Sequence, residues 1–336
     1  MWRDLKYLLA YSIPLAVALG LYFRGIWSYS GVWVAFVAIP LLEVFFTGNT
    51  ENLTEVEEDH QNGKWLFDLL LYLNVPMLAG MVWGYFYMLT HESLALYEVV
   101  GTTITVGIYL GGVGINVAHE LGHRASRLAK VAAGALLLPN LYMHFTVEHN
   151  YGHHVNIATP KDPASSRYNE SLYGFWVRSV VYSYLSAWQI EVRRLRQAQK
   201  SPLHWSNTMI HFQLIQLAYL LGIGWYFGWA MVPFAVLIAV LGFLMLETVN
   251  YIEHYGLQRR QLASGRYEPV QPWHSWNCNH DIGRIVLYEL TRHSDHHYKA
   301  TRKYQVLRHF HEAPLLPWGY PTSMLIALIP PLWFKW

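Results

Sequence analysis

The stretch "RHSDHH" (292–297) near the carboxyl end places three histidines within five residues, with Asp295 between them. The chain has 18 histidines, and half of them fall into four such groups, "HELGH", "EHNYGHH", "EHYG" and "RHSDHH". These candidate metal ligands are His119, His123, His149, His153, His154, His254, His293, His296 and His297. Imidazole is a common ligand of Zn, Cu, Fe and Ni, so the pattern indicates a metal site and leaves the metal open.

The spacing within each group predicts how the rings converge. Residues three or four positions apart on a helix project from one face, about 5–6 Å apart at Cβ. We expect three such pairs to converge, each on one point: His119/His123, His149/His153 and His293/His297. The adjacent His154 and His296 would then point toward a second ion or another edge of the site. Nine imidazoles are too many for one ion, so we expect two ions with four or five nitrogens each.

Each group also carries a carboxylate directly beside a proposed ligand, namely Glu120, Glu148, Glu253 and Asp295. A ligating imidazole usually donates its other N–H to a carboxylate or carbonyl oxygen, which fixes the tautomer. These acids are therefore candidates for orienting the histidines, and one of them could instead bridge two metal ions. The single cysteine, Cys278, excludes a centre built from four thiolates of this chain.

The segments that must position these groups are long and apolar. Hydrophobic residues make up 53% of the chain and charged residues only 14%, against roughly 25% charged in an average soluble domain. A membrane-spanning helix needs about 20 mostly apolar residues. Six segments qualify: 5–23, 27–46, 66–89, 97–118, 208–228 and 230–252. We predict an all-α integral membrane protein with six transmembrane helices and a cytoplasmic helical cap (119–207 and 253–336) that carries a histidine-rich dimetal site, all within one domain (1–336).

The distribution of positive charge predicts the orientation. Six spans place both termini, the loop after the second span and the two cap segments on one side of the membrane. Of the 24 Lys and Arg residues, all except Arg24 fall on that side. Cytoplasmic loops carry an excess of Lys and Arg. We therefore expect a multi-pass protein of the inner (cytoplasmic) membrane, with the metal site and the termini on the cytoplasmic side.

Several segments around the histidines carry a family resemblance. The segments "NYIEHYGL" (250–257) and "RHSDHH", with the flanking "ATPKDPASSR", "HSWNCNH", "YQVLRHF" and "LPWGYP", resemble the membrane-bound alkane 1-monooxygenases. These belong to a wider class of histidine-box diiron membrane enzymes that includes fatty-acid desaturases and hydroxylases. The resemblance runs from the second span to the end and implies that the nine histidines bind two non-haem iron ions. One departure is Glu43 in "PLLEVFFTG", where the family more usually has Asp.

The resemblance implies O2-dependent terminal hydroxylation of medium-chain n-alkanes to 1-alkanols. An unactivated methyl group has no acidic proton, so its oxidation requires metal-centred chemistry. The reaction consumes two electrons. No Gly-rich dinucleotide fingerprint follows a strand, and "GGVG" (111–114) lies inside a predicted span, where it indicates close helix packing. We therefore expect no flavin or nicotinamide bound by this chain. The resemblance names the external donor as rubredoxin, served by an NAD(P)H-dependent rubredoxin reductase. We expect membrane lipid as a further partner and no nucleic acid.

Two further sets of residues are candidates for recognition. An alkane partitions into the bilayer, so we expect a cavity between the spans, lined by aromatic residues such as Trp33, Phe36 and Phe45. Rubredoxins tend to be acidic, and a candidate dock is the basic set Arg193, Arg194, Arg196, Lys299, Arg302 and Lys303. The same basic residues could instead set the topology and meet anionic lipid.

Other functions remain open at the level of the sequence. A desaturase, a fatty-acid hydroxylase or a xylene-type monooxygenase acting on alkyl-aromatic substrates would use the same scaffold. The "HELGH" segment also fits the zinc-protease pattern with Glu120 as general base, but that function leaves seven clustered histidines unexplained. In a transporter the histidines of a pathway would lie at bilayer depth, whereas these lie beyond the predicted helix ends.

Overall fold

The computed structural model describes residues 2–46 and 48–336, and in these residues the regular secondary structure is helical. Among them, six helices are long and apolar enough to cross a membrane: Asp4–Phe23, Gly25–Phe45, Trp65–His91, Leu96–Gly122, Thr208–Phe227 and Trp229–His254. Each overlaps one predicted span, and the ends differ by a few residues. The predicted all-helical, multi-pass membrane fold is confirmed.

The spans consist of shorter helical segments joined end to end. The first two contain α1 (Ser12–Phe23), α2 (Ser30–Trp33), the π-helical η3 (Val34–Ala38) and α3 (Ile39–Phe45). The third and fourth contain α5 (Trp65–Tyr72), α6 (Asn74–His91), α7 (Leu96–Tyr109), the π-helical η4 (Leu110–Ile115) and α8 (Asn116–Gly122). The last two are α13 (Thr208–Phe227) and α14 (Val232–His254).

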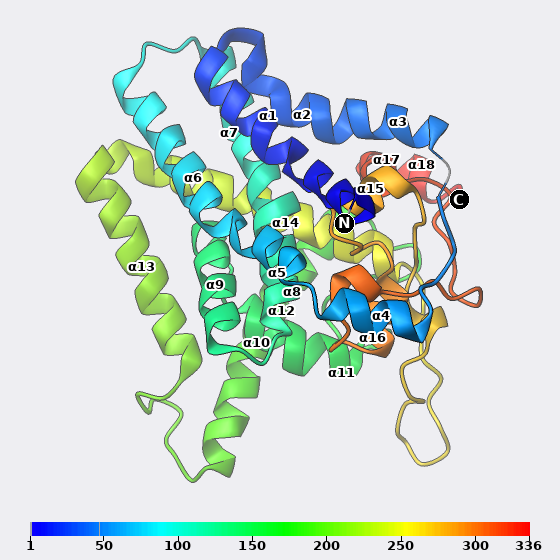
Figure 1. Cartoon of the computed structure of the whole chain (residues 1–336). Coiled ribbons are helices and arrows are strands. Elements are labelled where there is room, and N and C mark those ends of the chain that lie inside the picture. The colour runs from blue at the N-terminus through cyan, green and yellow to red at the C-terminus, as the bar shows by residue number, and fades with distance from the viewer. Residues whose placement is uncertain (1, 47) are drawn as a thin grey trace.

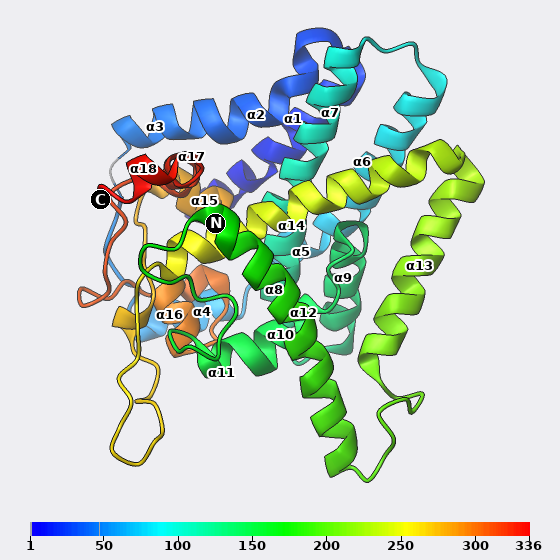
Figure 2. The same ribbon diagram turned by 180° about the vertical axis from the view of Figure 1, so that it is seen from behind.

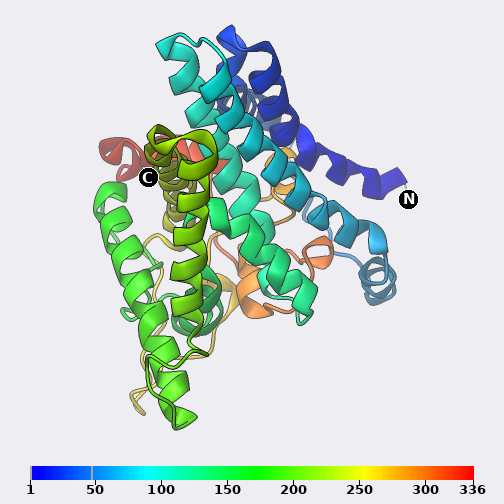
Figure 3. The same ribbon diagram turned by 90° about the vertical axis from the view of Figure 1, so that its left-hand side faces the viewer.

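The fourth span lies at the centre of the bundle. In its most apolar stretch 78% of the residues are buried, whereas the value for α13 is 11%. Accordingly α13 lies at the periphery, at the left of Figure 1. Figure 3 shows the amino-terminal span, in blue, on the opposite side of the molecule from the green helix α12 (Leu172–Gln197). The central span therefore contacts most of the elements that surround it.

Glycines allow the central span to pack closely against its neighbours, as predicted for "GGVG" (111–114). A Cβ atom added to Gly111 would lie 2.5 Å from the carbonyl oxygen of Gly242 in α14. One added to Gly114 would lie 2.7 Å from a methyl group of Leu78 in α6. Small residues at such positions let helix backbones approach each other in a membrane. This close approach fixes α14 beside η4, directly below the helix ends that carry histidines.

The cap is made of short helices and one long one. Its elements are α9 (Arg127–Leu137), α10 (Phe145–Glu148), the π-helical η6 (His149–His153), α11 (His154–Asn156), α12, α15 (Asp281–Val286), α16 (His293–Tyr298), α17 (Tyr320–Ala327) and α18 (Pro330–Trp333). Figure 2 shows α10, α11 and α16 gathered near the end of α14, while α12 lies nearer the viewer and extends beyond them. An ion pair of Arg24 with Glu92 joins the turns after the first and third spans at the opposite end of the bundle.

Candidate metal centre

The nine clustered histidines converge in the structure, and their ring nitrogens form two sets. The five-histidine group contains His119, His123, His149, His154 and His296, with adjacent Nε2 atoms 2.9–3.1 Å apart. The four-histidine group contains His153, His254, His293 and His297, with adjacent Nε2 atoms 2.8–3.2 Å apart. Within each group, one candidate ligand atom per residue lies within 4.8 Å of all the others.

Four parts of the chain supply these rings. The end of the fourth span brings His119 on α8 and His123 directly after it, and the end of the sixth span brings His254. The segment from η6 to α11 and the short helix α16 supply the remaining rings. Each group draws on at least three of these parts, so neither group forms unless the spans and the cap pack together.

One predicted pair is wrong. His149 and His153 were expected to converge as an α-helical pair, but they belong to different groups, and His149 pairs with His154 at an Nε2–Nε2 distance of 3.0 Å. The cause is that η6 is π-helical, so the N–H of His154 donates to the carbonyl oxygen of His149. A π turn places residue i+5 over residue i. The predicted pairs His119/His123 and His293/His297 each stay within one group.

The donor set fits metal ions. Two donors about 2.1 Å from one ion and roughly at right angles are about 3 Å apart, which is the spacing found in both groups. Burial lowers the pKa of His149, His154, His293, His296 and His297. For His123, burial and the nearby His153 lower the pKa to about 4. A neutral imidazole nitrogen makes one hydrogen bond, so several nitrogens facing one point are best satisfied by a shared cation.

Two of the four predicted carboxylates do not contact a histidine, and the predicted role is wrong for both. Glu120 accepts a hydrogen bond of 2.6 Å from Arg124, four residues later and just beyond the end of α8. Asp295 accepts hydrogen bonds from Arg302 at 2.7 Å and from the backbone N–H of Arg308 at 2.7 Å. Each carboxylate lies beside a histidine in sequence, but neighbours in a helix point in different directions.

The other two predicted carboxylates lie close to the centre. Burial and repulsion from Asp162 raise the pKa of Glu148 to about 8. Its Oε1 atom is buried and makes no hydrogen bond to the described residues. Glu253 faces the coordinating edge of a ring rather than its back, because its Oε2 atom lies 3.2 Å from Nε2 of His293. Its other oxygen accepts a 2.8 Å hydrogen bond from the hydroxyl of Tyr320.

The carboxylate that does orient a histidine is Asp162, which the sequence reasoning missed. It accepts a hydrogen bond of 2.9 Å from Nδ1 of His153 and another of 2.6 Å from Ser165. Burial alone would lower the pKa of His153, but the Asp162 carboxylate, together with Glu148 and Glu247, raises this pKa above its ordinary value. Asp162 lies in "ATPKDPASSR", a segment whose family resemblance was evident, so that signal could have identified it.

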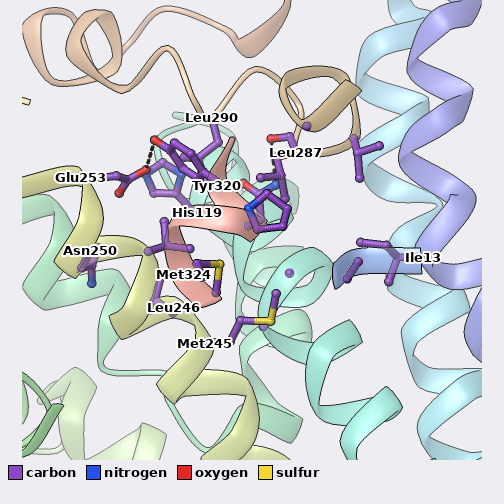
Figure 4. Close-up of a pocket in the computed structure, with 18 of the residues that line it drawn as sticks. Ile13, His119, Met245, Leu246, Asn250, Glu253, Leu287, Leu290, Tyr320 and Met324 are labelled. Atoms are coloured by element: carbon purple, nitrogen blue, oxygen red, sulfur yellow. Dashed lines mark hydrogen bonds between the residues drawn. The ribbon is translucent and has the colours of Figure 1, made fainter. Parts of the chain in front are cut away.

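An apolar cavity borders both histidine groups (Figure 4). His119, His149 and His293 line it together with Glu253 and Tyr320. Its other walls come from α1, the second span, η4, α14, α15 and α17, through Ile13, Ala35, Phe36, Ile39, Gly111, Gly112, Met245, Leu246, Val249, Val286, Leu287 and Met324. The arrangement brings a long aliphatic surface up to the faces of the imidazole rings.

Of the three aromatic residues predicted to line a substrate cavity, the structure places only Phe36 there. The side chains of Trp33 and Phe45 are 49% and 79% exposed on the outer surface of the second span. That prediction is wrong for both because lipid-facing positions of a membrane helix are as apolar as cavity-facing ones. Residue type alone could not separate the two faces of this helix.

The predicted basic dock does not form one surface. Arg193, Arg194 and Arg196 are exposed near the end of α12, which Figures 1 and 2 show to lie well apart from α16. Of these three, Arg194 forms an ion pair with Glu191. Arg302 and Lys303, which follow α16, are engaged in ion pairs within the chain, to Asp295 and Asp68 respectively. Lys299 is exposed. Exposed positive charge is therefore divided between two separate areas.

Comparisons with known proteins agree with this site. The family model "Fatty acid desaturase" matches residues 95–324, which include all nine histidines. Alkane 1-monooxygenase 2 of Pseudomonas aeruginosa is 41% identical over 327 residues, covering 96% of this chain and 86% of the relative. Alkane 1-monooxygenase 1 of the same organism is 41% identical over 309 residues, covering 91% and 81%. The xylene/toluene monooxygenase hydroxylase component XylM of Pseudomonas putida is 29% identical over 333 residues, covering 96% and 86%. The chain therefore belongs to the alkane 1-monooxygenase family of membrane-bound oxidoreductases.

Proposed function

We propose that the protein hydroxylates medium-chain n-alkanes to 1-alkanols with O2, at two non-haem iron ions held by the five-histidine and four-histidine groups. In this proposal the nine clustered histidines are all iron ligands. One observation carries the proposal: the two groups border the same apolar cavity, through His119 and His149 on one side and His293 on the other. A hydrocarbon in this cavity would meet both groups.

The residues of the chain have distinct tasks in this reaction, which converts RH, O2, two electrons and two protons to ROH and water. When bound, the two iron ions would supply the O2 chemistry that an unactivated C–H bond requires. The aliphatic walls bind the alkyl chain and exclude water, as apolar ligand cavities generally do. Phe36, Leu246 and Met324 leave space for the chain next to the histidines, so a terminal carbon can approach the rings. Asp162 holds His153 in one tautomer.

The choice of an alkane over an alkyl-aromatic substrate is supported by the comparisons. The two Pseudomonas aeruginosa relatives are named alkane 1-monooxygenases and are each 41% identical, whereas the relative named for xylene and toluene is 29% identical. The cavity walls agree, because they are mostly aliphatic and include the narrow positions Gly111 and Gly112. A fatty-acyl substrate would additionally need a site for its polar head.

The zinc-protease alternative fits the geometry poorly. It requires Glu120 to act as general base beside a zinc ion held by His119 and His123. Instead, the Glu120 carboxylate binds Arg124 and accepts a 3.4 Å hydrogen bond from the backbone of Tyr304. The two histidines share their group with three other rings. The Glu120 carboxylate is therefore already engaged by these two partners.

We propose rubredoxin, reduced by its NAD(P)H-dependent reductase, as the electron donor. In the five-histidine group, His123 and His154 are partly exposed, whereas all members of the four-histidine group are buried. The centre comes nearest to the surface at these two rings, which favours docking there. The exposed Arg193, Arg194, Arg196 and Lys299 remain candidates for guiding an acidic partner toward this surface. Their alternative role, contact with anionic lipid, would leave the electron-transfer rate insensitive to ionic strength.

The charge distribution supports an inner-membrane location with the histidine groups on the cytoplasmic side. Among Lys and Arg residues, Arg24 alone falls on the opposite side of the predicted topology, and its ion pair with Glu92 joins two turns at that end. Substrate would thus reach the cavity from the lipid, while electrons and protons arrive from the cytoplasm. Labelling of single introduced cysteines beside Arg24 and beside Arg196, in a Cys278→Ser background, would test the orientation.

The test of the reaction is direct. Purified, iron-loaded protein is incubated with rubredoxin, its reductase, NADH and octane under ¹⁸O2, and the products are resolved by position. We expect 1-octanol carrying one labelled oxygen atom. His293→Gln should abolish product, whereas the control His211→Gln, at an exposed histidine far from the centre, should not. An alkene, or no oxygenated product from loaded wild-type protein, would reject the proposal.

A further inference from the structure

Glu253 occupies an unusual position for a buried carboxylate. It is the second-last residue of α14, and its side chain is 1% exposed. One oxygen accepts a hydrogen bond of 2.8 Å from Tyr320, and the other lies 3.2 Å from Nε2 of His293. Figure 4 shows Glu253 beside Tyr320 at the histidine end of the apolar cavity. The carboxylate thus lies between the cavity and the four-histidine group.

Glu253 forms no ion pair with a lysine or arginine within the described part of the chain. The ion-pairing group beside it is the imidazole of His293. Burying a carboxylate is strongly unfavourable unless it is paired, fully hydrogen-bonded or bound to a metal. A single hydroxyl donor does not meet that requirement.

Another buried carboxylate on the same helix shows the contrast. Glu247 accepts hydrogen bonds from Tyr142 at 2.8 Å, Ser179 at 2.5 Å and Asn250 at 3.3 Å. Neutral donors therefore surround its two oxygens, and no histidine is among them. Glu253 lies less than two turns further along α14 and has one such donor. Its second oxygen instead points at the edge of a ring where a metal would bind.

The number and spacing of donor atoms in the four-histidine group leave a place for the Glu253 oxygen. The four-histidine group has one nitrogen fewer than its neighbour. The 3.2 Å between the Glu253 oxygen and His293 Nε2 equals the largest adjacent N–N distance within that group. Donors on one ion are expected about 3 Å apart. The oxygen lies at the cavity side of the group and thus occupies the place that a fifth donor would take.

We propose that Glu253 is the fifth protein donor to the metal ion of the four-histidine group, and that Tyr320 positions it. The inference rests on the proposed function in that it requires a metal ion in this group. It assigns Glu253 to direct coordination rather than to a hydrogen bond behind a histidine. Glu253 would be the donor nearest the substrate. Because carboxylate is a weaker and more mobile ligand than imidazole, it would also be the donor that can change its position at the metal ion.

Metal binding tests this proposal without an activity assay. Full-length wild-type protein, Glu253→Gln and Tyr320→Phe are loaded with Co²⁺ in detergent, and the ions retained per chain are measured against increasing chelator. Glu247→Gln is the matched control. We expect wild type and Glu247→Gln to retain two ions equally. Glu253→Gln should lose one of its two ions at least about tenfold more readily, with an altered visible spectrum for that ion. Tyr320→Phe should weaken the same ion less.

Two results would overturn the inference. One is a Glu253→Gln protein whose chelator curve and spectrum match those of wild type. The other is equal loss of both ions together with a lower unfolding temperature of the metal-free variant, which would indicate a structural role. If Glu253→Gln does not fold, Glu253→Asp keeps the charge and withdraws the oxygens, and it should shift the spectrum of one ion. Wild-type protein that binds fewer than two ions would instead refute the proposed function.

Discussion

The far end of the apolar cavity should determine which alkanes the protein accepts. Gly112 lies seven residues before His119 in the fourth span, about 10 Å along a helix. A Cβ atom added there would first meet the flexible end of Met245, at 3.2 Å. Gly112→Val should therefore fill the cavity without disturbing the backbone. At the neighbouring Gly111 the added atom would instead meet the carbonyl oxygen of Gly242 at 2.5 Å, so Gly111→Ala should impair folding.

The expected size of the effect follows from the volume lost. Valine adds three carbon atoms, so the cavity loses room for roughly three methylene groups of an alkane that extends as far as Gly112. Burial of one methylene contributes about 0.8 kcal/mol. The longest accepted alkanes should therefore lose about 2.4 kcal/mol of binding, on the order of 50-fold in kcat/KM, relative to alkanes three carbons shorter. Phe36→Ala should shift the preference in the opposite direction, because it enlarges the cavity.

The assay is a competition among n-alkanes from hexane to hexadecane in one vessel, with the alcohols quantified by gas chromatography. Product ratios report relative kcat/KM and do not depend on the amount of active enzyme. Trp33→Ala is the matched control, since Trp33 is on the same span but faces outward. If the ratios of Gly112→Val equal those of wild type, or if Trp33→Ala shifts them as much as Phe36→Ala does, the cavity is not the substrate site.

Three further predictions concern the surroundings of the centre. Asp162→Asn should weaken metal binding roughly 10- to 100-fold, because a neutral amide, which can also donate, replaces the charged acceptor that fixes the tautomer of His153; chelator titration measures this, and unchanged binding would contradict it. Burial lowers the pKa of His144 from 6.5 to about 3. As the pH falls below 6.5, His144 therefore becomes protonated in the unfolded chain but stays neutral in the folded state, which lowers the stability of the fold. Metal-free His144→Phe should therefore lose about 2 kcal/mol less stability than wild type between pH 7 and pH 5, and equal losses in denaturant unfolding would refute this. Arg302→Ala leaves a buried carboxylate unpaired and should cost about 3–5 kcal/mol of stability, whereas the exposed Arg193→Ala should change stability little and alter only the salt dependence of reduction by rubredoxin.

Sequence reasoning predicted the elements whose signal is local. Each span is a long apolar run, and hydropathy together with a length of about 20 residues suffices to locate it. The same holds for the gathering of histidines, because nine imidazoles at helix ends have few other uses. The glycines at 111–114 were also interpreted correctly, since small residues in a span permit close packing.

Sequence reasoning failed where the direction of a side chain decides its role. His149 and His153 have α-helical spacing, and only the backbone shows that this segment is π-helical. Glu120 and Asp295 stand beside histidines in sequence but turn toward Arg124 and Arg302. Asp162 was missed because it lies nine residues from His153 in the sequence, and only the folding of the intervening loop brings the two side chains together. Neighbouring residues in a helix point about 100° apart, so adjacency is a poor guide to contact.

The π-helical segments carry a consequence for how this chain can vary. A π turn is equivalent to one residue inserted into an α-helix, and such turns occur at η3, η4 and η6, all of which border the site. Deleting a single residue between 110 and 115 would restore regular α-helical winding, and because the wider turn already accommodates the extra residue, His119 would keep its direction. Deleting a residue from the regular helix α8 before His119 would instead rotate His119 by about 100°, away from its partners. Relatives with one residue fewer in η3 or η4 should therefore keep the histidine groups and differ in the shape of the cavity wall.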